Sequence, residues 1–170
     1  MVKVKLEFIG GLDFHIDDFT AYGDYMVDLP YEWLESIRVS LQKDLPLCFQ
    51  IDGGSSKALI VSDLDTFVID DRDWIKHSRD DFEYYFRVFK IDRIDLIKAI
   101  LPQLKANLDK LVRWDYRPDY WFTEQALKDR DSDLRALIKD CEELLEKNKN
   151  QTFRHLELIW EKDSNGESKN

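Results

Sequence analysis

The chain is poor in cysteine, histidine and glycine, and each shortage argues against a class of protein. Its two cysteines, Cys48 and Cys141, stand far apart in apolar patterns without a CxxC pair, so we expect buried, reduced thiols of a cytoplasmic protein. The three histidines are scattered and no GxSxG, GxGxxG or Walker motif occurs, which leaves nucleophilic catalysis and nucleotide binding without their usual motifs. The N-terminus lacks a continuous apolar run, so we predict neither a signal peptide nor a membrane span.

Acidic residues outnumber basic ones. Lys and Arg number 25 against 35 Asp and Glu, which gives a net charge of −10 over 170 residues. This charge repels phosphate backbones and anionic lipids, so we expect neither nucleic acid nor membrane as a partner. A basic protein partner suits such a surface, although acidity can also serve only to keep a protein in solution.

Short apolar runs with a period of two indicate strands in the first ninety residues. One helical pattern interrupts them at 31–44, with Pro30 just before its first turn. Residues 12–24 look polar and turn-rich, and no strand is predicted there. The predicted strands cover 2–8, 25–29, 47–51, 58–61, 67–69 and 84–91.

Helical spacing dominates the second half. One apolar helical face runs from Ile97 to Leu111, with a kink expected at Pro102, and another runs from Leu134 to Leu145. A last strand is predicted at 156–160, and the polar tail 163–170 is expected to be disordered. The predicted fold class is α+β. A mixed β-grasp-like sheet with one packed helix (1–92) precedes a helical hairpin and a final strand (93–162).

The stretch 58–75 carries five aspartates and offers the clearest candidates for chemistry. Asp63-Leu64-Asp65 follows a strand and resembles the nucleophile loop of haloacid-dehalogenase-like phosphatases, which would make Asp63 a nucleophile aided by magnesium. That family favours Gly-Thr after the motif, whereas this chain has Thr66-Phe67, and no long α/β alternation follows. An Asp-rich turn between antiparallel strands is therefore the favoured interpretation.

The acidic run after this motif lacks calcium spacing. Neither Asp63 nor Asp71 as a first ligand places Gly at the sixth and Glu at the twelfth position of an EF-hand loop. We predict no metal ligand, no cofactor and no catalytic residue.

Arginine and aromatic residues gather at 113–122, between the two helical patterns. These residue types are typical of interface hot spots, but they also fill helix–helix junctions, which we favour here. Asp115, Asp119 and the net charge argue against single-stranded nucleic acid. The candidate partner-binding residues are the acidic run and the exposed part of this aromatic segment: Asp70, Asp71, Asp73, Asp80, Asp81, Glu83, Trp114, Tyr116, Arg117, Tyr120 and Trp121.

Two short segments share a pattern with a known family. Residues 2–13, VKVKLEFIGGLD, and residues 68–74, VIDDRDW, resemble the opening strand with its glycines and the strand ending in Asn-Asp-x-Asp-Trp of ubiquitin-related modifier proteins. The resemblance covers about the first half of the chain and implies a β-grasp fold. The family's sulfur-carrier chemistry depends on a C-terminal Gly-Gly, whereas this chain ends Ser-Lys-Asn, so we do not expect carrier activity.

We therefore expect a non-catalytic, acidic protein-binding or inhibitory protein. Its most concrete form is an immunity-type protein that covers the basic active surface of a toxin or nuclease. The alternative is a ubiquitin-like docking element in a conjugation or sulfur-transfer pathway, and a magnesium-dependent phosphatase ranks third.

Overall fold

A computed structural model describes residues 2–9, 11–23, 28–53, 57–70, 86–114 and 123–148. Strands and helices both occur in these residues, which confirms the α+β class. In chain order the elements are β1 (Val4–Glu7), β2 (Leu12–Ile16), β3 (Phe19–Gly23), α1 (Leu29–Lys43), β4 (Leu47–Asp52), β5 (Lys57–Ser62), β6 (Thr66–Asp70), β7 (Phe86–Phe89), α2 (Arg93–Ala106), α3 (Leu108–Val112) and α4 (Glu124–Asn148).

The strands form two antiparallel sheets, in the orders β1-β2-β3 and β4-β5-β6-β7. The prediction of one mixed sheet is therefore wrong. Parallel neighbours need a long crossover, whereas short connections join β1 to β2, β2 to β3, β4 to β5 and β5 to β6 and leave these pairs antiparallel. Helix α1 is long enough to be such a crossover, but it connects β3 to a strand of the other sheet.

β2 and β3 form a hairpin where turns were predicted. Leu12, Phe14 and Ile16 face the core and alternate with polar side chains, so a period of two is present but spans only five residues in each arm. At the turn, Asp17 has a φ of 47°, a conformation that Asp tolerates better than most residues. Because the two strands are short and flanked by charged residues, their sequence pattern predicts loops.

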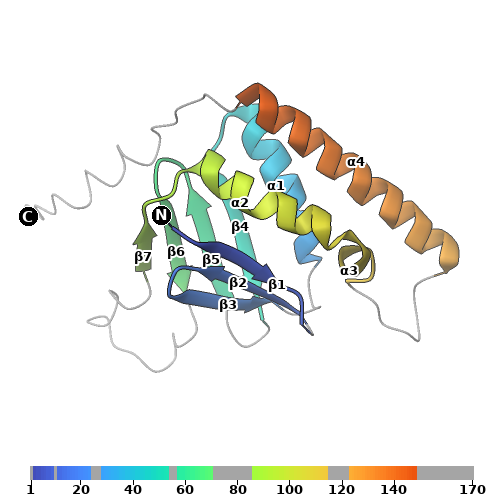
Figure 1. Ribbon diagram of the computed structural model, residues 1–170, viewed down its shortest axis with the longest axis horizontal. Coiled ribbons are helices and arrows are strands. Elements are labelled where there is room, and N and C mark those ends of the chain that lie inside the picture. The colour runs from blue at the N-terminus through green and yellow to red at the C-terminus, as the bar shows by residue number, and fades with distance from the viewer. Residues whose placement is uncertain are drawn as a thin grey trace, which may run out of the picture.

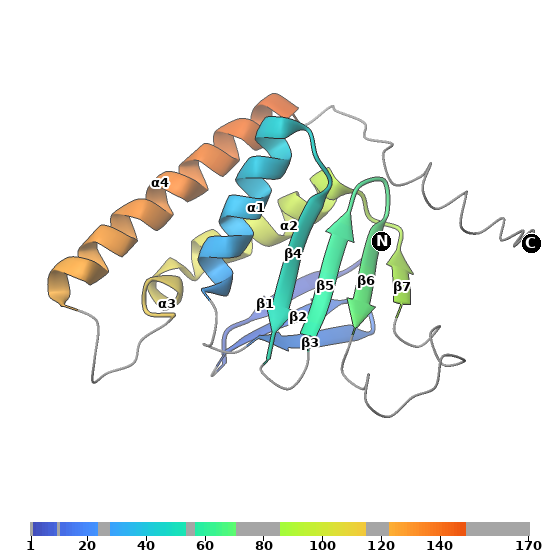
Figure 2. The same cartoon turned by 180° about the vertical axis from the view of Figure 1, so that it is seen from behind.

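The two sheets lie face to face, and their strands cross at a steep angle (Figures 1 and 2). Phe14 of β2, Trp33 of α1 and Phe49 of β4 meet in the core. The ring centres of Trp33 and Phe49 are 4.5 Å apart, and those of Phe14 and Trp33 are 6.0 Å apart. The indole Nε1 of Trp33 donates to the Gln50 carbonyl at 2.8 Å, which satisfies a polar atom that burial would otherwise leave unpaired.

Helix α1 confirms the helix predicted at 31–44 and begins two residues earlier, at Leu29. Asp28 caps it by accepting from the Tyr31 amide, and Pro30 lies in its first turn, where a missing amide hydrogen costs nothing. Of the predicted strand 25–29, residues 25–27 lie outside the described residues, and Leu29 is helical.

Both predicted helical patterns of the second half are confirmed, but their boundaries differ. α2 continues through Pro102, and the interruption falls at Asn107, whose side-chain amide donates to the Gln103 carbonyl at 2.9 Å. α4 begins at Glu124 and runs along the outer side of α1 (Figures 1 and 2). The predicted strand 156–160 and the tail 163–170 lie outside the described residues.

One cluster of buried apolar side chains includes residues from both predicted parts, 1–92 and 93–162. α2 packs on β1, and α4 packs on α1, α2 and α3. None of the described helices has the length and the apolar composition that crossing a membrane requires.

Candidate functional site

The aspartates of the DxD motif form the turn between β5 and β6. Asp63 is only 1% exposed, its amide donates to the Asp65 carbonyl at 3.0 Å, and Asp65 pairs with Lys90 at 2.6 Å. The two flanking strands are antiparallel, as predicted for an Asp-rich turn. A nucleophile must reach its substrate, and the Asp63 side chain is enclosed in this conformation.

Arg93, a residue that no sequence motif singles out, lies against this turn. Its side chain is fully buried, its amide donates to the Asp63 carbonyl at 2.7 Å, and its guanidinium donates to the Leu45 carbonyl and to Asp44. Burial lowers the pKa of Arg93, and the hydrogen bond to Asp44 opposes this effect. Arg93 therefore ties the start of α2 to the end of α1 through its guanidinium and to the turn through its backbone amide.

Two of the predicted partner-binding residues lie within the described residues, and both are buried. Asp70 ends β6 with 9% of its surface exposed, and Trp114 follows α3 with 2% exposed. Trp114 therefore packs in the core as a helix-junction residue and is not available to a partner. The other predicted contacts lie outside the described residues: Asp71, Asp73, Asp80, Asp81, Glu83, Tyr116, Arg117, Tyr120 and Trp121.

The side of the β4–β7 sheet that faces away from the β1–β3 sheet is lined by apolar side chains. None of the labelled helices covers this side in Figure 2. Strand pairing brings its residues into two rows that cross all four strands. We call this surface the apolar sheet face; its rows are Cys48, Val61, Phe67 and Val88, and Gln50, Leu59, Ile69 and Phe86.

Several side chains of the apolar sheet face are exposed to solvent. Leu59 and Ile69 are each 37% exposed and Val88 is 38% exposed, while the rings of Phe67 and Phe86 stack with centres 5.8 Å apart. Sequence reasoning missed this surface, although a signal exists. Residues 58–61 and 67–69 are apolar at every position, a pattern typical of strands that are covered on both sides.

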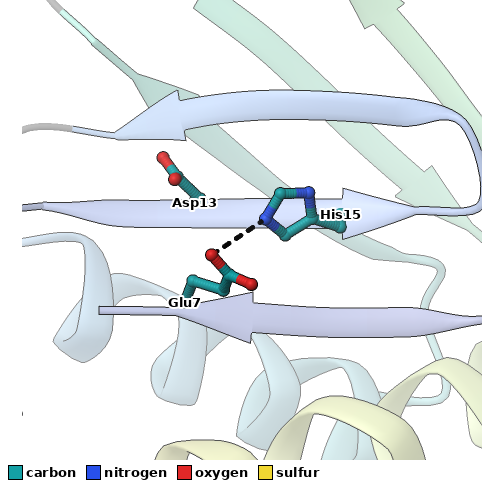
Figure 3. A group of neighbouring side chains, drawn as sticks. All are labelled: Glu7, Asp13 and His15. Carbon is teal, nitrogen blue, oxygen red and sulfur yellow. Dashed lines mark ion pairs between the residues drawn. The ribbon is translucent and has the colours of Figure 1, made fainter. Parts of the chain in front are cut away.

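The corresponding outward side of the β1–β3 sheet is polar. Glu7 lies opposite Asp13 in the strand register, and His15 follows two residues later on the same side of β2 (Figure 3). One potential ligand atom from each residue lies within 4.8 Å of the others. No sequence motif singles out this group, because only the hairpin register places Glu7 beside the two residues of β2.

Neighbouring side chains position the members of this group. The His15 Nδ1 atom lies 2.9 Å from the Thr20 hydroxyl, and its Nε2 atom lies 3.9 Å from the Glu7 Oε2 atom. Lys5 donates to the other Glu7 oxygen, and this hydrogen bond holds the pKa of the Glu7 carboxyl below its usual value. Glu7 is therefore ionised at neutral pH.

The two cysteines differ in their surroundings. Cys141 is buried as predicted, its thiol donates to the Leu34 carbonyl at 3.3 Å, and burial raises its pKa to about 12. The prediction that Cys48 is buried is wrong, because position 48 of β4 points outward on the apolar sheet face. Desolvation nonetheless raises the pKa of the Cys48 thiol.

No protein-family model, curated protein or solved structure matches the chain. The resemblance to ubiquitin-related modifiers therefore stays a prediction.

Proposed function

We propose that this chain is a non-catalytic binding protein that inhibits a basic protein partner, with the apolar sheet face as its docking surface. The observation that carries the proposal is the face itself, where every position in its two rows except Gln50 is apolar. Contiguous exposed apolar surface commonly marks an interaction site, because leaving it in water is unfavourable.

The composition of the face suits a protein partner. Phe67 and Phe86 offer two adjacent aromatic rings, and aromatic side chains supply much of the binding energy at interfaces. Leu59, Ile69 and Val88 add three exposed aliphatic side chains to the same face. Burying an apolar side chain completely contributes about 1.5–3 kcal/mol. Because these residues are only partly buried, a partner that covers them gains part of this free energy.

The acidic run predicted as a contact region follows β6 in the chain. Asp70 is the last residue of β6, and the connection that carries Asp71 to Glu83 leads from there to the neighbouring strand β7. With a net charge of −10, the chain favours a partner whose apolar contact is bordered by Lys and Arg. The immunity-type form of the proposal follows from this combination.

A pull-down from the native host tests the proposal. The wild-type chain should recover a basic enzyme whose activity falls when purified chain is added back. The double variant Leu59→Lys/Ile69→Lys should lose this enzyme, whereas Leu45→Lys, which changes an exposed leucine elsewhere, should keep it. Recovery of activating enzymes or sulfurtransferases would favour the ubiquitin-like alternative, and recovery of the same proteins by all three chains would contradict the proposed surface.

A further inference from the structure

We propose that Glu7, Asp13 and His15 form a binding site for a divalent transition-metal ion, with Zn²⁺ as the best-suited ion, on the polar side of the β1–β3 sheet. The proposal is independent of the docking surface, because the two sites lie on different sheets. Imidazole nitrogen together with carboxylate oxygen is a donor set that zinc accepts in proteins.

The spacing of the three side chains fits one ion. Two ligands of a single zinc ion lie at most about 4.4 Å apart, because each sits about 2.0–2.2 Å from the metal. The three ligand atoms here lie within 4.8 Å of one another, so side-chain shifts of a few tenths of an ångström suffice, on the order of ordinary side-chain motion. Two paired strands supply the ligands, so the backbone already holds them in register.

The surroundings of His15 supply a second, independent indication. Its Nε2 atom is enclosed, faces Glu7 and has no hydrogen-bond partner, which is an unfavourable state for a polar atom (Figure 3). Its Nδ1 atom is held by the Thr20 hydroxyl at 2.9 Å. When Nδ1 carries the proton and donates it to Thr20, Nε2 presents a free lone pair toward Glu7, which is the usual arrangement of a metal-bound histidine.

Lys5 provides a test in which a substitution should strengthen metal binding. Its ammonium pairs with Oε1 of Glu7 and leaves Oε2 facing His15, so the carboxylate can bind an ion without releasing Lys5. The positive charge of Lys5 nevertheless opposes a cation at this distance. Replacing Lys5 by an uncharged residue should therefore strengthen binding, a result that a partly unfolded variant cannot mimic.

Calorimetric titration of the full, untagged chain with Zn²⁺ tests the site, with Co²⁺ absorption spectra reporting the ligand set. We expect one ion per chain and loss of binding in His15→Gln. Thr20→Val, which removes only the group that positions His15, should weaken binding by roughly tenfold. Lys5→Met should tighten it by about threefold or more, since one opposing charge is gone.

His155→Gln is the matched control, because it removes another of the three histidines and should leave the affinity unchanged. Thermal unfolding of each variant checks that the fold is retained. No binding at about millimolar Zn²⁺, which corresponds to roughly −4 kcal/mol, would overturn the proposal. So would equal binding in His15→Gln, or weaker binding in Lys5→Met.

Discussion

Arg93 joins the end of α1 to a turn whose sequence resembles an active-site loop. Its guanidinium reaches the carbonyl of Leu45 and the carboxylate of Asp44, while its backbone amide binds the carbonyl of Asp63. The two side chains of the ion pair differ sharply in exposure, 0% for Arg93 and 56% for Asp44. The acceptors around Arg93, rather than the ion pair itself, should therefore dominate its contribution to stability.

Arg93→Met should lower the free energy of unfolding by about 2 to 3 kcal/mol, because it removes the hydrogen bonds that a charged donor makes to the Leu45 carbonyl and to Asp44. Asp44→Asn should lower it by at most about 1 kcal/mol, since water screens an exposed carboxylate. Denaturant titration followed by circular dichroism measures both. Similar losses in the two variants would contradict a structural role centred on the buried guanidinium.

The two cysteines should differ in reactivity toward a thiol reagent at pH 8. Burial raises the pKa of Cys141 to about 12, so its reactive thiolate is scarce at that pH, whereas Cys48 is exposed. We expect one thiol to react in the native chain, two in denaturant, and none in native Cys48→Ser. Rapid reaction of Cys141 in the native chain would contradict the packing of α4 against α1.

At the scale of elements, local signals located most helices and strands. Pro30 and the apolar spacing behind it mark α1, and the runs at 47–51, 58–61 and 67–69 correspond to β4, β5 and β6. The hairpin of β2 and β3 was missed because its arms are short, and the break at Asn107 was placed at Pro102. Both errors occur where side-chain hydrogen bonds and tertiary packing outweigh local preference.

Contacts between elements are harder to predict, and the pair formed by Asp28 and Arg130 is an example. The residues lie 102 positions apart, yet Arg130 of α4 donates to both carboxylate oxygens of Asp28, the N-cap of α1. Arg130 also donates to the Leu111 carbonyl at the end of α3. A single side chain thus connects three helices.

A double-mutant cycle measures this connection. Asp28→Asn keeps a capping oxygen but removes the charge, and Arg130→Met removes the cation. We expect a coupling of about 1 kcal/mol between the two substitutions, because the pair is bidentate and only partly exposed. The pair Arg135 and Asp131, exposed within one helix, is the control and should show a coupling of at most about 0.5 kcal/mol. Coupling no larger than the control would mean that the ion pair does not hold the helices together.

At the scale of the whole molecule, the apolar periodicities indicated the α+β class and the composition indicated an acidic surface. Neither indicated which surface is apolar. Whether Leu59 or Ile60 faces outward depends on how the β4–β7 sheet packs against the other sheet, and no local pattern determines that. The group of Glu7, Asp13 and His15 likewise depends on the strand register. The predicted contacts Asp70 and Trp114 are buried. The proposed binding surface is therefore the apolar sheet face.

The most direct measurement compares how tightly two variants of this chain bind the purified partner. The two variants carry the same substitution at different positions. Val88 on the apolar sheet face is 38% exposed and Val39 on α1 is 39% exposed, so Val88→Lys and Val39→Lys add the same charge at equally exposed valines. We predict that Val88→Lys weakens binding by at least about tenfold, or 1.4 kcal/mol, and that Val39→Lys changes it by less than about twofold. Equal affinities in the two variants would contradict docking through the apolar sheet face.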